Sequence, residues 1–197
     1  MELQSGEKYF LVTDYKSSEK EMRWSSLGAG IQVQLPIYLY AVQQGLKGYN
    51  PAGGVFQPIR EIVVETNPES VNNEIRKVAR TQGIVLDDKT VQTGMDPLKV
   101  SKKSPTSDII PVVSAEEMRE MIQSALQITG SLIDLQFDGE TIPSPLIEGD
   151  RAPCEYCMIH QACSRDPRIP GGQGRILIHK KPEILAPVFP DLDKKNR

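Results

Sequence analysis

Near its N-terminus the chain reads Lys8-Tyr9-Phe10-Leu11-Val12-Thr13-Asp14-Tyr15-Lys16, a run of β-branched and aromatic residues that ends in a carboxylate and an ammonium group two positions apart. This composition predicts a strand over residues 8–13 that ends at Asp14 and follows a hairpin turn at residues 5–7. Side chains two positions apart lie on the same face of a strand, so Asp14 and Lys16 can act on one phosphate.

The pattern Asp-x-Lys suits metal-assisted phosphodiester cleavage. Asp14 and the backbone carbonyl of Tyr15 are candidate Mg²⁺ ligands, and Lys16 would orient the attacking water or neutralise charge on the phosphate. The same pattern is also common where both side chains are merely solvated at the end of a strand. On its own, therefore, it does not identify a catalytic site.

A second polar pair occurs about twenty residues further along the chain, in a segment that predicts a mostly apolar helix. Apolar residues recur at three- and four-residue steps over residues 27–44, which predicts a helix that is kinked at Pro36 or begins near Val33. Gln34 and Tyr38 are one helical turn apart and share a face. The simpler interpretation is that Gln34 bonds backbone groups and that Tyr38 is a core aromatic residue.

The rest of the first 140 residues predicts further strands and helices. Residues 55–64 form a second strand after a break at Gly53-Gly54, residues 69–80 a polar helix, and residues 82–88 a short strand. Ser114 and Glu117 have the spacing of a capping box and open a helix that runs to Ile128. The order β-α-β in the first part of the chain indicates an α/β fold.

Three cysteines, Cys154, Cys157 and Cys163, occur within ten residues of one another in the pattern C-x₂-C-x₅-C. Thiols this dense most often bind metal, but three thiolates leave a tetrahedral zinc ion or a four-iron cluster one ligand short. His160 could complete a zinc site, although four ligands at three-residue steps would crowd along one short helix. A third possibility is that the cysteines are reduced and bind no metal.

Composition limits the function classes. The chain has 197 residues, 39% of them hydrophobic, and a net charge of −3, which suits one core with a small appendage and excludes a histone-like nucleic-acid binder. No apolar run approaches the ~20 residues of a membrane helix, so we expect a cytoplasmic protein with no membrane partner. Basic residues form local groups that would contact DNA or else form solvated faces: Lys99, Lys102 and Lys103, and a larger group of Arg165, Arg168, Arg175, Lys180 and Lys181.

Taken together and in this order, the motifs resemble a known family. The segments that carry the resemblance are residues 14–18, 32–41 and 153–157 together with Cys163; residues 54–56 and 83–88 also resemble that family's connecting region. They are similar to the C-terminal nuclease domain of AddB-type helicase-nuclease subunits, in the RecB-like branch of the PD-(D/E)XK nucleases. The resemblance covers nearly the whole chain.

The resemblance implies a restriction-endonuclease-like core, a mixed sheet flanked by helices, over residues 1–150. A cysteine segment at 151–181 and an extended tail at 182–197 would follow it. Asp14 and Lys16 would be catalytic, with Gln34 and Tyr38 supporting the site, and Cys154, Cys157 and Cys163 would ligate a [4Fe-4S] cluster. The function implied is Mg²⁺-dependent exonuclease activity in a bacterial helicase-nuclease that repairs double-strand breaks by recombination. Its partners would be DNA, expected to be single-stranded, and an AddA-like subunit.

The sequence departs from the family pattern in two ways. The family's fourth cluster cysteine lies far upstream, and no cysteine precedes Cys154. The family's second metal-binding aspartate lies on the preceding hairpin strand, which places it at about Met1 or just before it, with Glu2 nearby. We therefore expect a fragment of a longer protein that cuts DNA poorly by itself. A Cas4-like nuclease and a non-catalytic DNA-holding or subunit-docking module are the alternatives.

Overall fold

The computed structural model describes residues 2, 6–17, 21–59, 82–94, 112–140, 145–148, 152–160, 162, 163 and 174–177. Its elements in chain order are β1 (Lys8–Lys16), α1 (Trp24–Gly28), α2 (Gln34–Gly45), β2 (Tyr49–Pro58), β3 (Gln82–Leu86), α4 (Lys89–Gly94), β4 (Val112–Val113), α5 (Ala115–Phe137), β5 (Leu146–Ile147), the 3-10 helix η1 (Pro153–Tyr156) and β6 (Arg175–Ile176).

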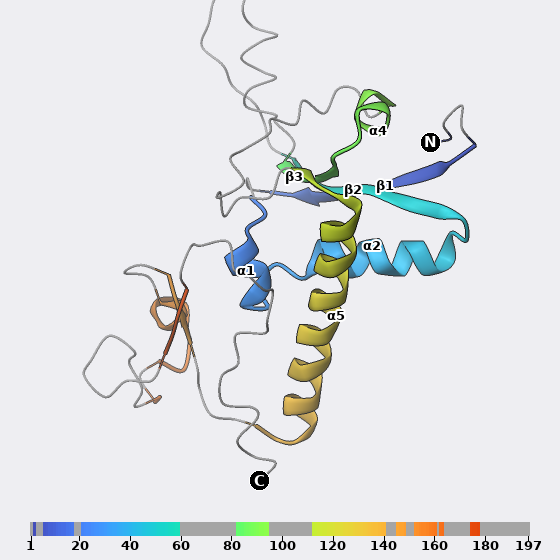
Figure 1. Ribbon diagram of the computed structural model, residues 1–197. Helices are drawn as coiled ribbons and strands as arrows, with labels where there is room; N and C mark the ends of the chain where they lie inside the picture. Colours follow the sequence, from blue (N-terminus) through green and yellow to red (C-terminus); the bar gives the residue numbers. More distant parts are fainter. Residues whose placement is uncertain are drawn as a thin grey trace, which may run out of the picture.

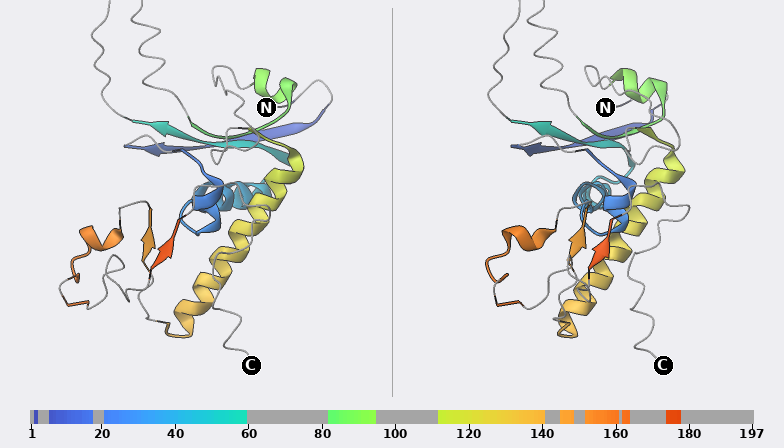
Figure 2. Two further views of the ribbon diagram at one scale, coloured as in Figure 1. Left: turned by 60° about the vertical axis from the view of Figure 1, so that its left-hand side comes forward. Right: turned by 90° about the vertical axis from the view of Figure 1, so that its left-hand side faces the viewer.

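Strands β1 to β4 form one sheet in the order β1-β2-β3-β4. β1 runs parallel to β2, β2 antiparallel to β3, and β3 parallel to β4, so the sheet is mixed. Helices α1, α2 and α5 lie on one side of this sheet and α4 lies on the other (Figure 1). The predicted α/β architecture, a mixed sheet flanked by helices, is therefore confirmed. β5 and β6 form a separate parallel pair on the same side as α1, α2 and α5 (Figure 2).

The core forms because β1 alternates its side chains between the two faces of the sheet. Phe10 faces the helices and joins the main cluster with Leu35 and Leu39 of α2 and with the buried face of α5. Tyr9, one position earlier, faces the other way and packs in a small cluster with Ala52, Leu86 and Val91 beside α4. A single strand thus anchors both layers.

β2 and β3 approach each other closely at two glycines. Gly53 and Gly83 have φ of +157° and +158°, and a Cβ at either would collide with the backbone of the facing strand. Only glycine fits there, because any side chain would push the strands apart. The Gly53-Gly54 pair that looked like a break in the sequence therefore lies inside β2.

Several predicted boundaries change. β1 continues through Asp14 to Lys16, and β2 begins at Tyr49, so a strand starting only at residue 55 is wrong. α2 begins at Gln34 with Val33 as N-cap, which confirms the later of the two predicted starts; Pro36 lies in the first turn, where its missing N–H has no intrahelical acceptor to lose.

The predicted capping box is confirmed at the start of α5, where Ser114 accepts from the Glu117 N–H at 3.1 Å and Glu117 accepts from the Ser114 N–H at 2.9 Å. α5 continues to Phe137, beyond the predicted end at Ile128. No helix in the described part of the chain is long and apolar enough to cross a membrane. The predicted helix at 69–80 and the tail at 182–197 lie outside the described residues.

Candidate active site at the end of β1

The site lies where the last residues of β1 meet the first turn of α2. α2 packs against β1, β2 and α5, and its Leu35 and Leu39 are 0% exposed. Gly54 of β2 lies directly beneath Leu35, so the first turn of the helix comes close to the sheet. These contacts place Gln34 and Tyr38 beside the end of β1.

Lys16 is the centre of a chain of polar contacts. Its Nζ lies 2.9 Å from Asp14 Oδ2 and donates a hydrogen bond of 2.8 Å to Gln34 Oε1. Gln34 Nε2 in turn donates to the Tyr38 hydroxyl at 2.7 Å. The ammonium also lies 5.7 Å from the centre of the Phe56 ring, a cation–π distance. The four residues singled out from the sequence are thus brought together.

The Asp14 carboxylate retains an unused acceptor. Lys16 Nζ is within ion-pair distance of Oδ2 but outside hydrogen-bonding geometry, so Oδ2 is buried without a hydrogen-bond partner in the described part of the chain. The carbonyl of Tyr15 also points away from β2, because the next carbonyl, that of Lys16, accepts from Ile59 N–H on the β2 side. A carboxylate oxygen and a backbone carbonyl are ligand types that Mg²⁺ prefers.

Glu2 does not supply a second carboxylate at this site. It pairs with Lys8 in an antiparallel bridge, and its carboxylate lies 3.8 Å from Lys8 Nζ. Lys8 lies about 20 Å from Asp14 along the strand. This bridge fits the predicted hairpin, but a strand continued in this register reaches the level of Asp14 about six residues before Glu2.

The cysteine segment is arranged differently. Cys154 and Cys163 are half-buried and Cys157 is exposed, all three as free thiols. Within the described ranges no three His, Cys, Asp or Glu side chains come together as a group that could hold a metal ion. The iron-sulfur cluster and a zinc site completed by His160 therefore both stay predictions. The iron-sulfur cluster rests on the cysteine spacing and the family resemblance.

Of the basic residues considered for DNA contact, only Arg175 is described; Lys99, Lys102, Lys103, Arg165, Arg168, Lys180 and Lys181 lie outside the described residues. Arg175 is half-buried in β6, and burial lowers the pKa of its guanidinium. Because the Arg175 side chain is partly buried, less of its guanidinium is accessible to a DNA phosphate. On the other side of the sheet, burial and then the charges of Glu7 and Asp88 raise the pKa of the Tyr9 hydroxyl.

Two residues at or near the site were not singled out from the sequence. Phe56 pairs with Asp14 across β1 and β2, which puts its ring next to Lys16. Gln32 binds the backbone of the segment that leads into α1. Neither has a sequence signal, since Phe56 reads as an ordinary strand residue and the partners of Gln32 are main-chain atoms.

Comparison with known proteins is consistent with this geometry. The family model described as "PD-(D/E)XK nuclease superfamily" matches residues 2–164. Similar curated proteins include one from Symbiobacterium thermophilum, 28% identical over 93% of this chain and 17% of its own length, and one from Clostridium botulinum strain Hall, 28% identical over 97% and 18%. One from Moorella thermoacetica is 28% identical over 87% and 17%.

Each of these three relatives is named as a subunit of an "ATP-dependent helicase/deoxyribonuclease". The chain spans only 17% to 18% of the length of these relatives.

Proposed function

Because the chain belongs to the PD-(D/E)XK nuclease superfamily, we propose that it is the metal-dependent DNA nuclease domain of an AddB-like helicase-nuclease subunit. The observation that carries the proposal is the unbroken run of contacts from Asp14 through Lys16 and Gln34 to Tyr38. A solvated Asp-x-Lys would not be tied to a helix in this way. Exonuclease action on single-stranded DNA, an AddA-like partner and a role in break repair in the cytoplasm belong to the same proposal.

Asp14 and the Tyr15 carbonyl would hold Mg²⁺, because both offer oxygen atoms that the sheet does not use. A bound Mg²⁺ supplies a more acidic water and neutralises charge on the phosphate. One side-chain carboxylate and one carbonyl leave most of an octahedral shell to water, so these two groups alone would hold the ion weakly. A second carboxylate from the strand beside β1 would hold it firmly.

The position of Lys16 suits it to neutralise negative charge on the phosphate. Its ammonium has a carboxylate, an amide oxygen and an aromatic face around it, and its side chain is 26% exposed, which leaves room for a phosphate oxygen. A charge fixed in position before the reaction stabilises the transition state without a cost for reorganisation.

The direction of the hydrogen bonds assigns a task to Tyr38. An ammonium can only donate, so the Gln34 amide must turn its oxygen toward Lys16 and its nitrogen toward Tyr38. The Tyr38 oxygen is thereby an acceptor, and its own proton is left to donate elsewhere. Since Tyr38 is 41% exposed, that proton would donate to the DNA backbone.

We extend the proposal to the cysteines. Cys154, Cys157 and Cys163 would ligate an iron-sulfur cluster when a fourth ligand is supplied from elsewhere, since three thiolates do not complete the set. The free, partly exposed thiols are chemically suited to this role. No step of the cleavage reaction depends on it.

One observation favours a second candidate, a module that holds DNA or docks a subunit without cutting. Asp14 is the carboxylate that pairs with Lys16, and among the described residues no group of three acidic, His or Cys side chains could hold a metal ion. A site that has lost its metal would look the same. Cleavage assays separate the two candidates.

The test measures degradation of labelled single-stranded DNA with Mg²⁺ or with EDTA, using this chain and a longer form that includes the strand before β1. The variants are Asp14→Asn and Lys16→Met, with the exposed residues Asp134→Asn and Lys47→Met as matched controls. We expect weak cleavage by this chain, Mg²⁺-dependent cleavage by the longer form, and a loss of about 1,000-fold or more in the two site variants.

Full activity in Asp14→Asn would show that the chemistry lies elsewhere. No cleavage by the longer form under any metal condition would favour the non-catalytic module.

A further inference from the structure

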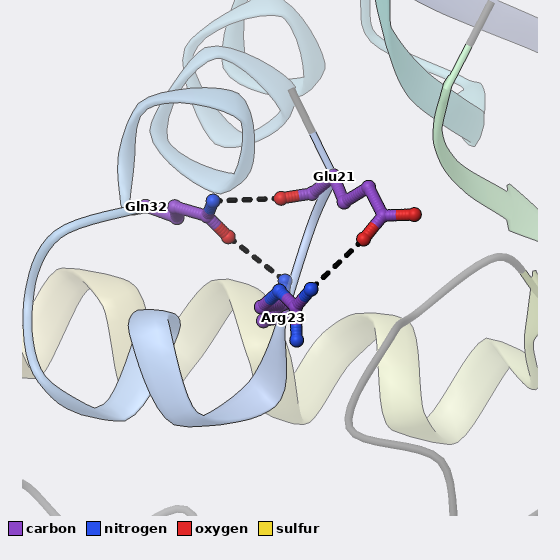
Figure 3. A network of polar contacts seen from close by, with 3 residues as sticks. All are labelled: Glu21, Arg23 and Gln32. Atoms are coloured by element: carbon purple, nitrogen blue, oxygen red, sulfur yellow. Dashed lines mark hydrogen bonds and ion pairs between the residues drawn. The ribbon is translucent and has the colours of Figure 1, made fainter. Parts of the chain in front are cut away.

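The Gln32 side chain joins the start of α2 to the segment that precedes α1. Its Oε1 accepts a 2.8 Å hydrogen bond from the backbone N–H of Arg23, and its Nε2 donates a 2.7 Å bond to the carbonyl of Glu21 (Figure 3). The Arg23 guanidinium donates to the Glu21 carboxylate at 3.0 Å beside these bonds. One amide therefore satisfies two main-chain groups that lie nine and eleven positions earlier in the sequence.

This pairing works because the earlier segment is extended. Arg23 has φ −131° and ψ 138°, so the Glu21 carbonyl and the Arg23 N–H point to the same side and flank Met22. Met22 is 1% exposed and belongs to the main core. Gln32 thus hydrogen-bonds one edge of the extended segment, at the point where the backbone turns into α1, whose N-cap makes no side-chain capping bond.

The other end of the same loop is closed by main-chain bonds. The N–H groups of Ile31 and Gln32 both donate to the Ser26 carbonyl, at 2.9 Å and 3.3 Å. With both ends tied, the loop that contains α1 is a closed unit fixed to the residue just before the Val33 N-cap of α2. The next residue, Gln34, contacts Lys16.

We propose that Gln32 is a positioning residue of the nuclease site: by clamping residues 21–23 it fixes the first turn of α2 and so keeps Gln34 Oε1 in contact with Lys16 Nζ. The effect of the clamp on the position of Gln34 does not depend on the proposed function, and only its effect on cleavage rests on that function. The two glutamines have separate tasks, since Gln34 contacts the ammonium whereas both hydrogen bonds of the Gln32 amide in the clamp go to backbone atoms.

The first experiment reads the Gln34 side-chain amide by NMR in ¹⁵N-labelled protein, independently of activity. Gln32→Met removes both hydrogen bonds and keeps the length of the side chain, while Gln34→Met assigns the resonance. Gln44→Met, at an exposed position near the end of α2, is the matched control. We expect Gln32→Met to shift the Gln34 amide resonance and to speed hydrogen exchange at the Arg23 amide about tenfold or more, and the control to change neither.

An unchanged Gln34 resonance in folded Gln32→Met protein would overturn the proposal. If that variant does not fold, Gln32→Glu replaces it, because it keeps the acceptor for Arg23 and removes only the donor to Glu21. The expected shift of the Gln34 resonance is then the same in direction and smaller.

The second experiment measures Mg²⁺-dependent cleavage by the longer form in a double-mutant cycle. We expect Gln32→Met to lower kcat about tenfold with little change in KM, because a small misplacement of a site residue costs rate more than binding. The double variant should be no slower than Gln34→Met alone, since Gln32 acts through Gln34.

Additive losses would show that Gln32 supports only overall stability and would overturn the proposal. If no form of the protein cleaves DNA, the proposed function fails while the NMR result still decides the clamp.

Discussion

The end of β1 and the cysteine segment differ in what holds them. Around Lys16, contacts come from β1, β2 and α2, and the side chains that anchor α2, Leu35 and Leu39, are 0% exposed. In the cysteine segment, Tyr156 and Met158 are 85% and 101% exposed, and the cysteines are free. The first region is organised by burial of apolar surface. The second has little apolar burial among its described residues, and so it would need a ligand to organise it.

The largest test of this contrast removes an anchor from each region. Leu39→Ala should lower the free energy of unfolding by about 3 kcal/mol, because it leaves a cavity beneath the helix that carries Gln34. Ile159→Ala, at an exposed site in the cysteine segment, should change it by less than about 0.5 kcal/mol. Urea denaturation followed by circular dichroism measures both. Equal losses would mean that the cysteine segment is as firmly packed as the core.

An intermediate test weakens the support of α2 from a distance. Ser114→Ala removes the hydroxyl that caps α5, the helix against which α2 packs. We expect a loss of about 1 kcal/mol in stability, the usual value for an N-cap. Ser114→Asp, which keeps an acceptor, should restore most of it. If Ser114→Ala lowered the unfolding temperature of the cysteine segment alone and left that of the core unchanged, the contrast between the two regions would be wrong.

The smallest expected effect is in the cysteine segment itself. In metal-free protein, Cys157→Ser should change stability by less than about 0.5 kcal/mol, because the thiol is exposed and unpaired. In a longer form purified without oxygen, the same substitution should instead reduce bound iron and sulfide. Absence of both elements from that unmodified longer form would end the cluster hypothesis.

Much of the site was predictable because its residues sit on regular elements. The two-residue step from Asp14 to Lys16 and the four-residue step from Gln34 to Tyr38 each put a pair on one face, whatever surrounds them. The contact between the pairs follows once the strand and helix pack. The role of Gln32 could not be predicted from the sequence, because its hydrogen-bond partners are backbone groups. Every residue has a backbone carbonyl, so such partners leave no pattern in the sequence.

The errors in the fold have physical causes as well. A five-residue helix such as α1 is too short to show helical periodicity. The Gly53-Gly54 pair of β2 looks like a turn in the sequence, whereas Gly53, together with Gly83 of β3, allows the two paired strands to lie close together. The position of Glu2 depends on register, which a residue pattern cannot fix for a short hairpin strand.

The parallel pairing of β1 and β2 has a consequence for biosynthesis. Asp14 lies opposite Phe56, and the whole of α1 and α2 lies between them in the chain. Parallel neighbours cannot pair until the crossover that joins them is complete. During synthesis on a ribosome, β1 therefore cannot pair with β2 until β2 has emerged. The Phe56 ring can contact the Lys16 ammonium only after that pairing.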